Sequence, residues 1–209
     1  MKTRLIRSLS LLTLFALWTI AVCTVDVQAI GPQGSTVGFA ALNGYVHTLT
    51  GVHFTLYHIT DWLGLVPVAV CLAFAVSGLV QWIRRGFFKV DRDLFVLGGF
   101  YIVVIAAYLL FEEAVINYRP VLIDGFAEAS YPSSTTLLVL CVMPTAAMQL
   151  NRRMHQGLCR TVVTWIIVAF TAFMVVGRLL SGVHWLTDIV GGGLLSAALV
   201  TMYRALAET

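Results

Sequence analysis

Charged side chains are scarce in this chain. Asp, Glu, Lys and Arg account for 11% of its 209 residues and hydrophobic residues for 59%, whereas soluble proteins carry about 25% charged residues. This composition excludes an ordinary soluble domain. The formal net charge of +3 is carried by basic residues at the edges of apolar runs, so we expect no nucleic acid among the partners of this protein.

The four cysteines show no spacing that is typical of a metal site. Cys23, Cys71 and Cys141 fall in apolar runs, Cys159 falls in a short polar segment, and no two of them form a C-x-x-C pair. We interpret them as small packing residues. The chain also lacks internal repeats and low-complexity tracts.

Long apolar runs, in contrast, are abundant. Several approach or exceed the ~18 residues that indicate a transmembrane helix. The sequence therefore predicts an all-α, polytopic membrane protein that forms one domain over residues 1–209. The six predicted spans cover about 8–28, 62–83, 94–113, 133–151, 161–178 and 184–204.

The first apolar run has two interpretations. Basic residues precede it, and Val27-Gln28-Ala29 resembles a signal-peptidase site. The uncharged stretch over residues 8–25 is, however, longer than the ~7–15 residues of a signal-peptide core. We therefore favour a retained first span over a cleaved signal peptide.

Basic residues orient the predicted spans. With six spans and the N-terminus inside, all of the thirteen Lys and Arg residues except Arg119 and Arg178 lie on the inner side, which is a strong positive-inside bias. We therefore expect cytoplasmic N- and C-termini, and the compact six-span form favours a bacterial plasma membrane. The two outer arginines need a local reason, such as binding an anion.

The longest outer connection, residues 26–61, follows the first span. From about Val37 to Ile59 its apolar and aromatic residues recur partly at helical spacing, which predicts an amphipathic segment at the outer membrane interface. His47, His53 and His58 lie in this segment, but their spacing does not place all three on one helical face. We interpret them as interfacial polar residues rather than as a metal cluster.

A second outer segment, from Glu112 to Pro132, is rich in polar side chains. Pro132, followed by hydroxyl residues and an apolar run, predicts a helix start. Such a start presents free backbone N–H groups and the positive end of the helix dipole, which together favour anions. A well-capped membrane helix without any ligand would explain the same pattern.

The stretch from Arg178 to Asp188 carries three ionisable groups beside an apolar run. His184 and Asp188 are four residues apart, so on a helix they share one face. A carboxylate there can accept the ring N–H of His184, fix its tautomer and leave the other nitrogen free to attack. Arg178 offers planar donors suited to a phosphate. The sequence thus predicts a site for phosphoryl chemistry, although an Arg–Asp pair at a helix end can also be purely structural.

Three short motifs resemble those of the type 2 phosphatidic acid phosphatase (PAP2) superfamily, which also includes the vanadium haloperoxidases. The family pattern is K-x6-R-P, then P-S-G-H, then S-R-x5-H-x3-D. The matching residues are Arg119-Pro120, Pro132-Ser133-Ser134-Thr135 and Gly177-Arg178-x5-His184-x3-Asp188. The resemblance covers about residues 112–188. It implies a PAP2-like bundle of six helices with its site at the outer face.

The resemblance also implies roles for individual residues. His184 is expected to be the nucleophile that forms a phospho-histidine intermediate, Asp188 to orient it, and Arg119 and Arg178 to hold phosphate oxygens. Hydrogen bonds to the phosphate are expected from Ser133, Ser134 and Thr135. Because two guanidiniums and a helix N-terminus supply positive charge, we expect neither a metal nor any other cofactor.

Two departures from the family pattern matter for the chemistry. Glu112 stands seven residues before Arg119, where the family has lysine, and it replaces a phosphate-binding cation with an anion. Thr135 stands where the family has the histidine that protonates the leaving oxygen. A threonine hydroxyl cannot act as an acid near neutral pH.

Three explanations for the missing acid remain open. In the first, the substrate has a good leaving group, as in a lipid diphosphate such as a polyprenyl diphosphate. In the second, another residue supplies the proton, and the candidates are His47, Glu113 and Glu128. In the third, the chain has lost hydrolysis and binds lipid phosphates or transfers between them.

The sequence therefore predicts a lipid phosphatase or phosphotransferase, acting on a lipid phosphate or diphosphate of the bilayer from the outer face. The alternative is a non-catalytic lipid-phosphate binding or transport protein built on the same helices.

Overall fold

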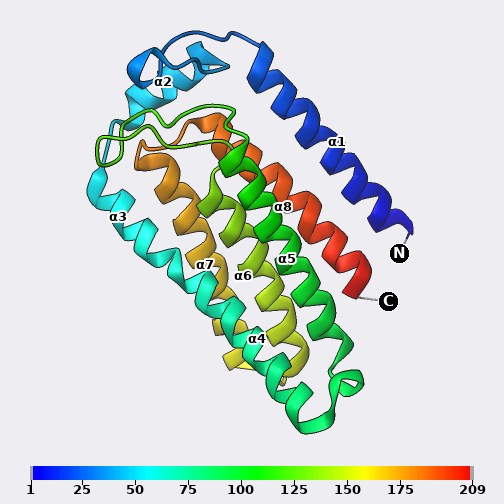
Figure 1. Cartoon of the computed structure of the whole chain (residues 1–209). Coiled ribbons are helices and arrows are strands. Elements are labelled where there is room, and N and C mark those ends of the chain that lie inside the picture. The colour runs from blue at the N-terminus through cyan, green and yellow to red at the C-terminus, as the bar shows by residue number, and fades with distance from the viewer. Residues whose placement is uncertain (1, 208–209) are drawn as a thin grey trace.

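The computed structural model describes residues 2–207, and all of its long elements are α-helices (Figure 1). Two short 3-10 helices, Pro32–Gly34 and Phe87–Lys89, lie in connections. The eight α-helices are α1 (Lys2–Thr24), α2 (Ala40–Thr50), α3 (Phe54–Leu63), α4 (Leu65–Arg85), α5 (Arg92–Glu113), α6 (Ser134–Arg153), α7 (Leu158–Leu180) and α8 (Leu186–Ala207).

Six stretches of the described chain are long and apolar enough to cross a membrane. Helices α3 and α4 together form one of them, Phe54–Arg85, and the other five are α1, α5, α6, α7 and α8. The prediction of an all-α protein with six spans is thus confirmed. The helices extend beyond several predicted spans, and α1 begins at Lys2. Backbone hydrogen bonding continues after an apolar run ends, and the basic side chains there can reach the membrane surface.

The amphipathic segment predicted over residues 37–59 forms α2 and the first part of α3. The break between them falls at Gly51, whose φ of 65° lies in the left-handed region that favours glycine. Figure 1 shows α2 at the end of the bundle where α1 ends and α8 begins. This end of the molecule is called the α2 end below.

Helices α6 and α8 form the centre of the bundle. Helix α6 packs against α7 and α8, while α1 lies along α8 (Figure 1). Half of the residues (50%) in the apolar stretch of α6 are buried, and the same holds for α8. In the apolar stretch of Phe54–Arg85 only 6% are buried. The main core joins α1, α5, α6 and α8 through residues that include Phe15, Leu97, Leu137 and Leu199.

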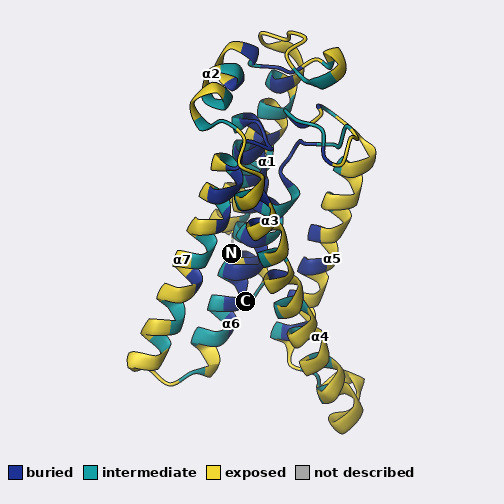
Figure 2. Cartoon of the chain, turned by 90° about the vertical axis from the view of Figure 1, so that its left-hand side faces the viewer, coloured by how far each residue is buried: buried dark blue, intermediate teal, exposed yellow. Residues whose placement is uncertain are grey.

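The outward faces of α4 and α7 remain exposed and apolar. Figure 2 shows both helices largely in the colour of exposed residues, and their exposed side chains include Leu72, Val76, Trp165 and Ile166. Apolar helix faces of this length are suited to lipid acyl chains, since all backbone polar groups are bonded within the helix. The chain is therefore a multi-pass membrane protein.

Tyr131 ties the loop before α6 to the helices around it. Its hydroxyl lies 2.7 Å from Thr19 Oγ1 of α1, and its ring stacks on Phe15 with centroids 6.3 Å apart. A Cβ at Gly191 would lie 2.5 Å from the Tyr131 ring, so glycine at this position lets the ring rest against α8. Tyr131 thereby anchors its neighbour Ser130 at the α2 end.

Candidate functional site

Four charged or titratable residues singled out in the sequence are buried at the α2 end. The exposed fractions are 8% for Arg119, 1% for Arg178, 3% for His184 and 0% for Asp188. Arg119 comes from the loop between α5 and α6, Arg178 from the last turn of α7, and Asp188 from the first turn of α8. Buried charges require partners or a ligand, so their contacts decide what this region can do.

A tight turn carries the chain from Arg178 to His184. Ser181 ends α7 and its carbonyl accepts the backbone N–H of His53 at 2.9 Å. Gly182 follows with a φ of 68°, and a Cβ on it would lie 1.8 Å from the carbonyl oxygen of Gly51. Glycine is required here for both reasons, and the turn brings His184 into the bundle before α8 begins.

Three donors hold the carboxylate of Asp188. The backbone N–H of Trp185 donates to Oδ2 at 2.9 Å, and the amide of Asn117 donates to Oδ1 at 3.1 Å. The hydroxyl of Ser130 also donates to Oδ2. Since Asp188 is fully buried, these bonds take the place of water around its charge.

His184 and Asp188 do not share a helical face as their spacing predicted. His184 precedes Leu186, where α8 starts, so the chain between the two residues is not continuous helix. Their Nδ1 and Oδ2 atoms are 3.7 Å apart. The Oγ of Ser130 lies 3.1 Å from Nδ1 of His184 and donates to Oδ2 of Asp188. A serine hydroxyl therefore stands between the histidine and the aspartate.

His184 is held in its neutral form. Burial lowers its pKa from 6.5 to about 4, and the positive charges of Arg119 and Arg178 act in the same direction, while Asp188 acts in the opposite one. Its Nε2 is buried and has no hydrogen-bond partner among residues 2–207. A neutral imidazole with one unoccupied nitrogen is the state required of a nucleophile or a base.

The two arginines share one aromatic ring. The Cζ of Arg178 lies 4.9 Å and that of Arg119 5.8 Å from the centroid of Tyr57 in α3. Arg178 also donates to Asp61 Oδ1 at 3.4 Å, and Arg119 Nε lies 3.2 Å from Glu128 Oε2. Within the described chain, Arg119 Nη1 and Arg178 Nε are buried without a hydrogen-bond partner. Buried guanidinium donors without acceptors indicate an anion site.

The predicted phosphate-binding hydroxyls divide into two groups. Ser133 caps α6, where its Oγ accepts the N–H of Thr136 at 3.4 Å, and its own N–H donates to the carbonyl of Asp188 at 3.1 Å. Ser134 and Thr135 lie half-buried in the first turn of α6. No side-chain contact joins either of them to His184 or to the two arginines in the part of the chain that the structure describes.

The three candidates for a replacement acid lie in different places. His47 Nε2 lies 3.2 Å from the carbonyl of Gly182, and its ring packs 5.5 Å from that of Trp185. Glu128 forms the ion pair with Arg119, and Glu113 is exposed in the last turn of α5. Among residues 2–207, no hydrogen bond or ion pair joins any of these three to His184. The ion pair of Arg119 is with Glu128 and not with Glu112.

Sequence reasoning assigned no role to Ser130, Asn117, Tyr57 or Asp61. Ser130 and Asn117 stand in the polar segment before Pro132, but nothing in their spacing indicates that both reach Asp188. Tyr57 and Asp61 lie in α3, one helical turn apart, and they meet Arg178 only through the packing of α3 on α7.

Comparisons with known proteins identify the family and the fold. The sequence model of the PAP2 superfamily matches residues 69–209. The fold is similar to the crystal structure of a transmembrane PAP2 type phosphatidylglycerolphosphate phosphatase from Bacillus subtilis, with a TM-score of 0.62, 17% sequence identity and 96% of each chain covered. A search of curated protein sequences finds no match. Because the family model spans most of the chain, including both arginines, His184 and Asp188, the protein belongs to the PAP2 superfamily.

Proposed function

We propose that this protein hydrolyses or transfers the phosphoryl group of a lipid phosphate or diphosphate, with His184 as the nucleophile. The observation that carries the proposal is the buried, unpartnered Nε2 of His184 near two buried guanidiniums, each of which keeps at least one buried nitrogen, Arg119 Nη1 and Arg178 Nε, without an acceptor in the described chain. A phosphate would supply acceptors for Arg119 and Arg178 and present its phosphorus to the imidazole. Membership of the PAP2 superfamily supports the same chemistry.

The reaction proceeds in two displacements. The lone pair of His184 Nε2 attacks phosphorus, an N–P bond forms, and the P–O bond to the leaving group breaks with its electron pair on that oxygen. Water, or an acceptor hydroxyl in a transfer reaction, then attacks phosphorus, and the N–P bond breaks with its electron pair on Nε2. The attacking oxygen loses its proton to solvent, and the neutral imidazole is restored. Arg119 and Arg178 neutralise the charge on the non-bridging oxygens in both steps.

The missing acid favours a substrate with a good leaving group. Among residues 2–207, no hydrogen bond or ion pair joins His47, Glu113 or Glu128 to His184. Glu128 forms its ion pair with Arg119. A lipid diphosphate, such as a polyprenyl diphosphate, releases a phosphorylated anion that needs less help from an acid than an alkoxide does. We therefore place diphosphates ahead of monophosphates as substrates.

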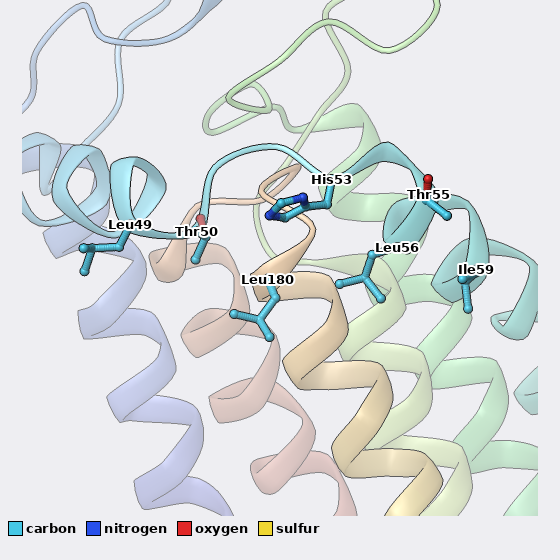
Figure 3. A pocket seen from close by; sticks show the side chains of 7 residues that line it. All are labelled: Leu49, Thr50, His53, Thr55, Leu56, Ile59 and Leu180. Atoms are coloured by element: carbon cyan, nitrogen blue, oxygen red, sulfur yellow. The ribbon is translucent and has the colours of Figure 1, made fainter.

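An apolar hollow at the α2 end fits the lipid part of such a substrate. It has a volume of about 610 Å³ and lies between the end of α2, α3 and the end of α7 (Figure 3). Leu49, Leu56, Ile59 and Leu180 line it. A chain in this hollow would keep its phosphate at the α2 end.

We also propose that the α2 end faces the outside of a plasma membrane, with both termini cytoplasmic. The basic connections between α4 and α5 and between α6 and α7 lie at the other end of the bundle (Figure 1). These connections and the helix ends that adjoin them contain Arg84, Arg85, Lys89, Arg152, Arg153 and Arg160. Such clusters favour the cytoplasmic side.

Phosphate release by the purified full chain in lipid nanodiscs tests the proposal. Polyprenyl diphosphate, phosphatidic acid and phosphatidylglycerolphosphate are supplied in parallel, the last because the similar Bacillus subtilis protein is named for it. We expect release from at least one lipid, loss of turnover in His184→Ala, and full activity in His155→Ala, an exposed histidine between α6 and α7.

The same preparation separates catalysis from binding alone. A non-catalytic binding or transport protein would release no phosphate, and His184→Ala would bind the lipid as wild type does, while Arg119→Gln and Arg178→Gln would not. Equal turnover in wild type and His184→Ala would refute His184 as the nucleophile.

A further inference from the structure

We infer that Ser130 is a positioning residue that fixes the tautomer of His184 and connects its ring to Asp188. The inference rests on the proposed function, in which His184 attacks phosphorus. It departs from a direct histidine–aspartate contact, because a serine hydroxyl stands between the two side chains.

The count of hydrogens determines the tautomer. The Ser130 hydroxyl has one hydrogen, and it is donated to Asp188 Oδ2 because an ionised carboxylate can only accept. The Ser130 oxygen must then accept from the other neighbour, Nδ1 of His184, at 3.1 Å. Nδ1 therefore carries the ring proton of His184. Nε2 is left with its lone pair, and no described residue forms a hydrogen bond with it.

Backbone pairing in the α5–α6 loop holds Ser130 in register with Asn117. The N–H of Ser130 donates to the carbonyl of Asn117 at 3.0 Å, and the N–H of Arg119 donates to the carbonyl of Glu128 at 3.0 Å. The two paired residues each bind one oxygen of Asp188: Asn117 binds Oδ1 and Ser130 binds Oδ2. One loop thus fixes the carboxylate and carries Arg119 beside it.

Burial makes this bridge hard to replace. Ser130 is 2% exposed, His184 3% and Asp188 0%. Without the hydroxyl, the Nδ1–H would face a carboxylate 3.7 Å away, beyond hydrogen-bonding distance. A buried donor without an acceptor is costly, so the ring would rotate, change tautomer or admit water.

The bridge also has a role during the reaction. When Nε2 bonds to phosphorus, the imidazole becomes positively charged and its Nδ1–H becomes a stronger donor. The Ser130 oxygen accepts that bond while its own hydrogen remains with Asp188, so the carboxylate stabilises the cation through the hydroxyl. No proton needs to leave Nδ1 in this step. Removal of Ser130 should therefore slow formation of the phosphoenzyme without weakening phosphate binding.

Nitrogen NMR of the wild-type protein tests the tautomer directly. The full chain is labelled with ¹⁵N-histidine in nanodiscs at pH 7, and the His184 signals are assigned by their absence in His184→Asn. We expect a protonated Nδ1 and an unprotonated Nε2, which have widely separated ¹⁵N shifts. A protonated Nε2 would overturn the inference, and this result does not depend on any variant of Ser130.

Kinetics on the same preparation test the role in turnover. We expect Ser130→Ala to lower kcat roughly 10²-fold or more, as when a catalytic imidazole loses its orienting partner, with little change in KM. Ser130→Thr, which keeps the hydroxyl, should recover most of the loss. Ser196→Ala is the matched control, because Ser196 is also 2% exposed and donates to backbone carbonyls of α6 and α8, away from His184 and Asp188.

The outcomes separate this inference from the proposed function. If His184→Ala is inactive while Ser130→Ala keeps its kcat, the nucleophile stands and the role of Ser130 is refuted. If Ser130→Ala and Ser196→Ala lose activity equally, Ser130 has only a structural role and the inference is again refuted. If His184→Ala remains active, the proposed function itself fails.

Discussion

The guanidinium of Arg178 lies over the ring of Tyr57, with its Cζ 4.9 Å from the ring centroid. Arg119 approaches the same ring at 5.8 Å, so one aromatic side chain accompanies both buried cations of the site. The negative face of an aromatic ring attracts cations. Tyr57 therefore offsets part of the cost of keeping two like charges close together.

Replacement of Tyr57 by leucine should weaken substrate binding. Loss of the ring removes a cation–π contact and leaves the guanidiniums less well placed, and we expect KM to rise roughly tenfold. Tyr57→Phe keeps the ring and should stay near wild type. Steady-state kinetics in nanodiscs measure both, and equal KM values for leucine and phenylalanine would show that the ring plays no part.

Neutralising Glu128 should tighten binding rather than slow the reaction. Glu128 is 42% exposed and occupies Arg119 at 3.2 Å, so it competes with the substrate phosphate. We expect Glu128→Gln to lower KM by up to about fivefold, the range of a partly exposed ion pair. Asp93→Asn, which breaks the ion pair of Asp93 with Arg152 at the other end of the bundle, is the control. A fall in kcat confined to monophosphates would instead identify Glu128 as the acid.

The pH dependence of activity should reflect the neutral state of His184. Since burial lowers its pKa from 6.5 to about 4, the nucleophile remains unprotonated well below neutrality. We expect the acidic limb of kcat/KM against pH to lie near pH 4. If the acidic limb instead lies near pH 6.5 in the wild type and in every other active variant, the imidazole of His184 is solvated in the free enzyme.

The same shift predicts how stability depends on pH. Above pH 6.5 His184 is neutral in both the folded and the unfolded chain, so it adds no dependence. Between about pH 6.5 and 4 only the unfolded chain binds the proton, and stability falls as the pH falls. Thermal unfolding in detergent should therefore show a smaller decrease in Tm over this interval for His184→Gln than for wild type. Identical pH profiles would contradict the depressed pKa.

Filling the apolar hollow should discriminate between long and short substrates. Leu180 lines this hollow at the end of α7 (Figure 3), and tryptophan there would occupy space proposed for a lipid chain. We expect Leu180→Trp to raise KM several-fold for a long-chain lipid diphosphate and to leave a short-chain, water-soluble analogue unaffected. Leu158→Trp, at the exposed opposite end of α7, is the control. Equal effects on both substrates would argue against a chain in this hollow.

Restoring the family histidine should reveal the leaving group. Thr135→His supplies an acid at the position where the PAP2 pattern has one. If the natural substrate is a diphosphate, we expect a gain of roughly 10²-fold or more in hydrolysis of lipid monophosphates and little gain with diphosphates. Phosphate release from matched mono- and diphosphates measures this. An equal gain with both would show that the missing acid limits the natural reaction too.

The membrane architecture could be predicted from the sequence because it depends on local composition. A run of apolar residues as long as a bilayer is thick must form a helix there, since no water is present to bond its backbone. The six spans follow from this alone. Their ends were less predictable, as α1 shows by beginning at Lys2, because helical hydrogen bonding does not stop with hydrophobicity.

The approach of Arg178 to His184 was also predictable, since only five residues separate them. The geometry between His184 and Asp188 was not. Helical spacing predicted direct contact, but Gly182 turns the chain and α8 starts after His184, which leaves 3.7 Å between Nδ1 and Oδ2.

The sequence by itself thus determined the spans and a short segment with residues of the proposed site. Only the tertiary structure decided which distant side chains complete that site. Ser130 and Asn117 reach Asp188 from a loop 58 and 71 residues earlier in the chain, and Tyr57 reaches Arg178 from α3. Such contacts depend on how whole helices pack against one another. That packing depends on shape summed over many side chains, which no local pattern of residues records.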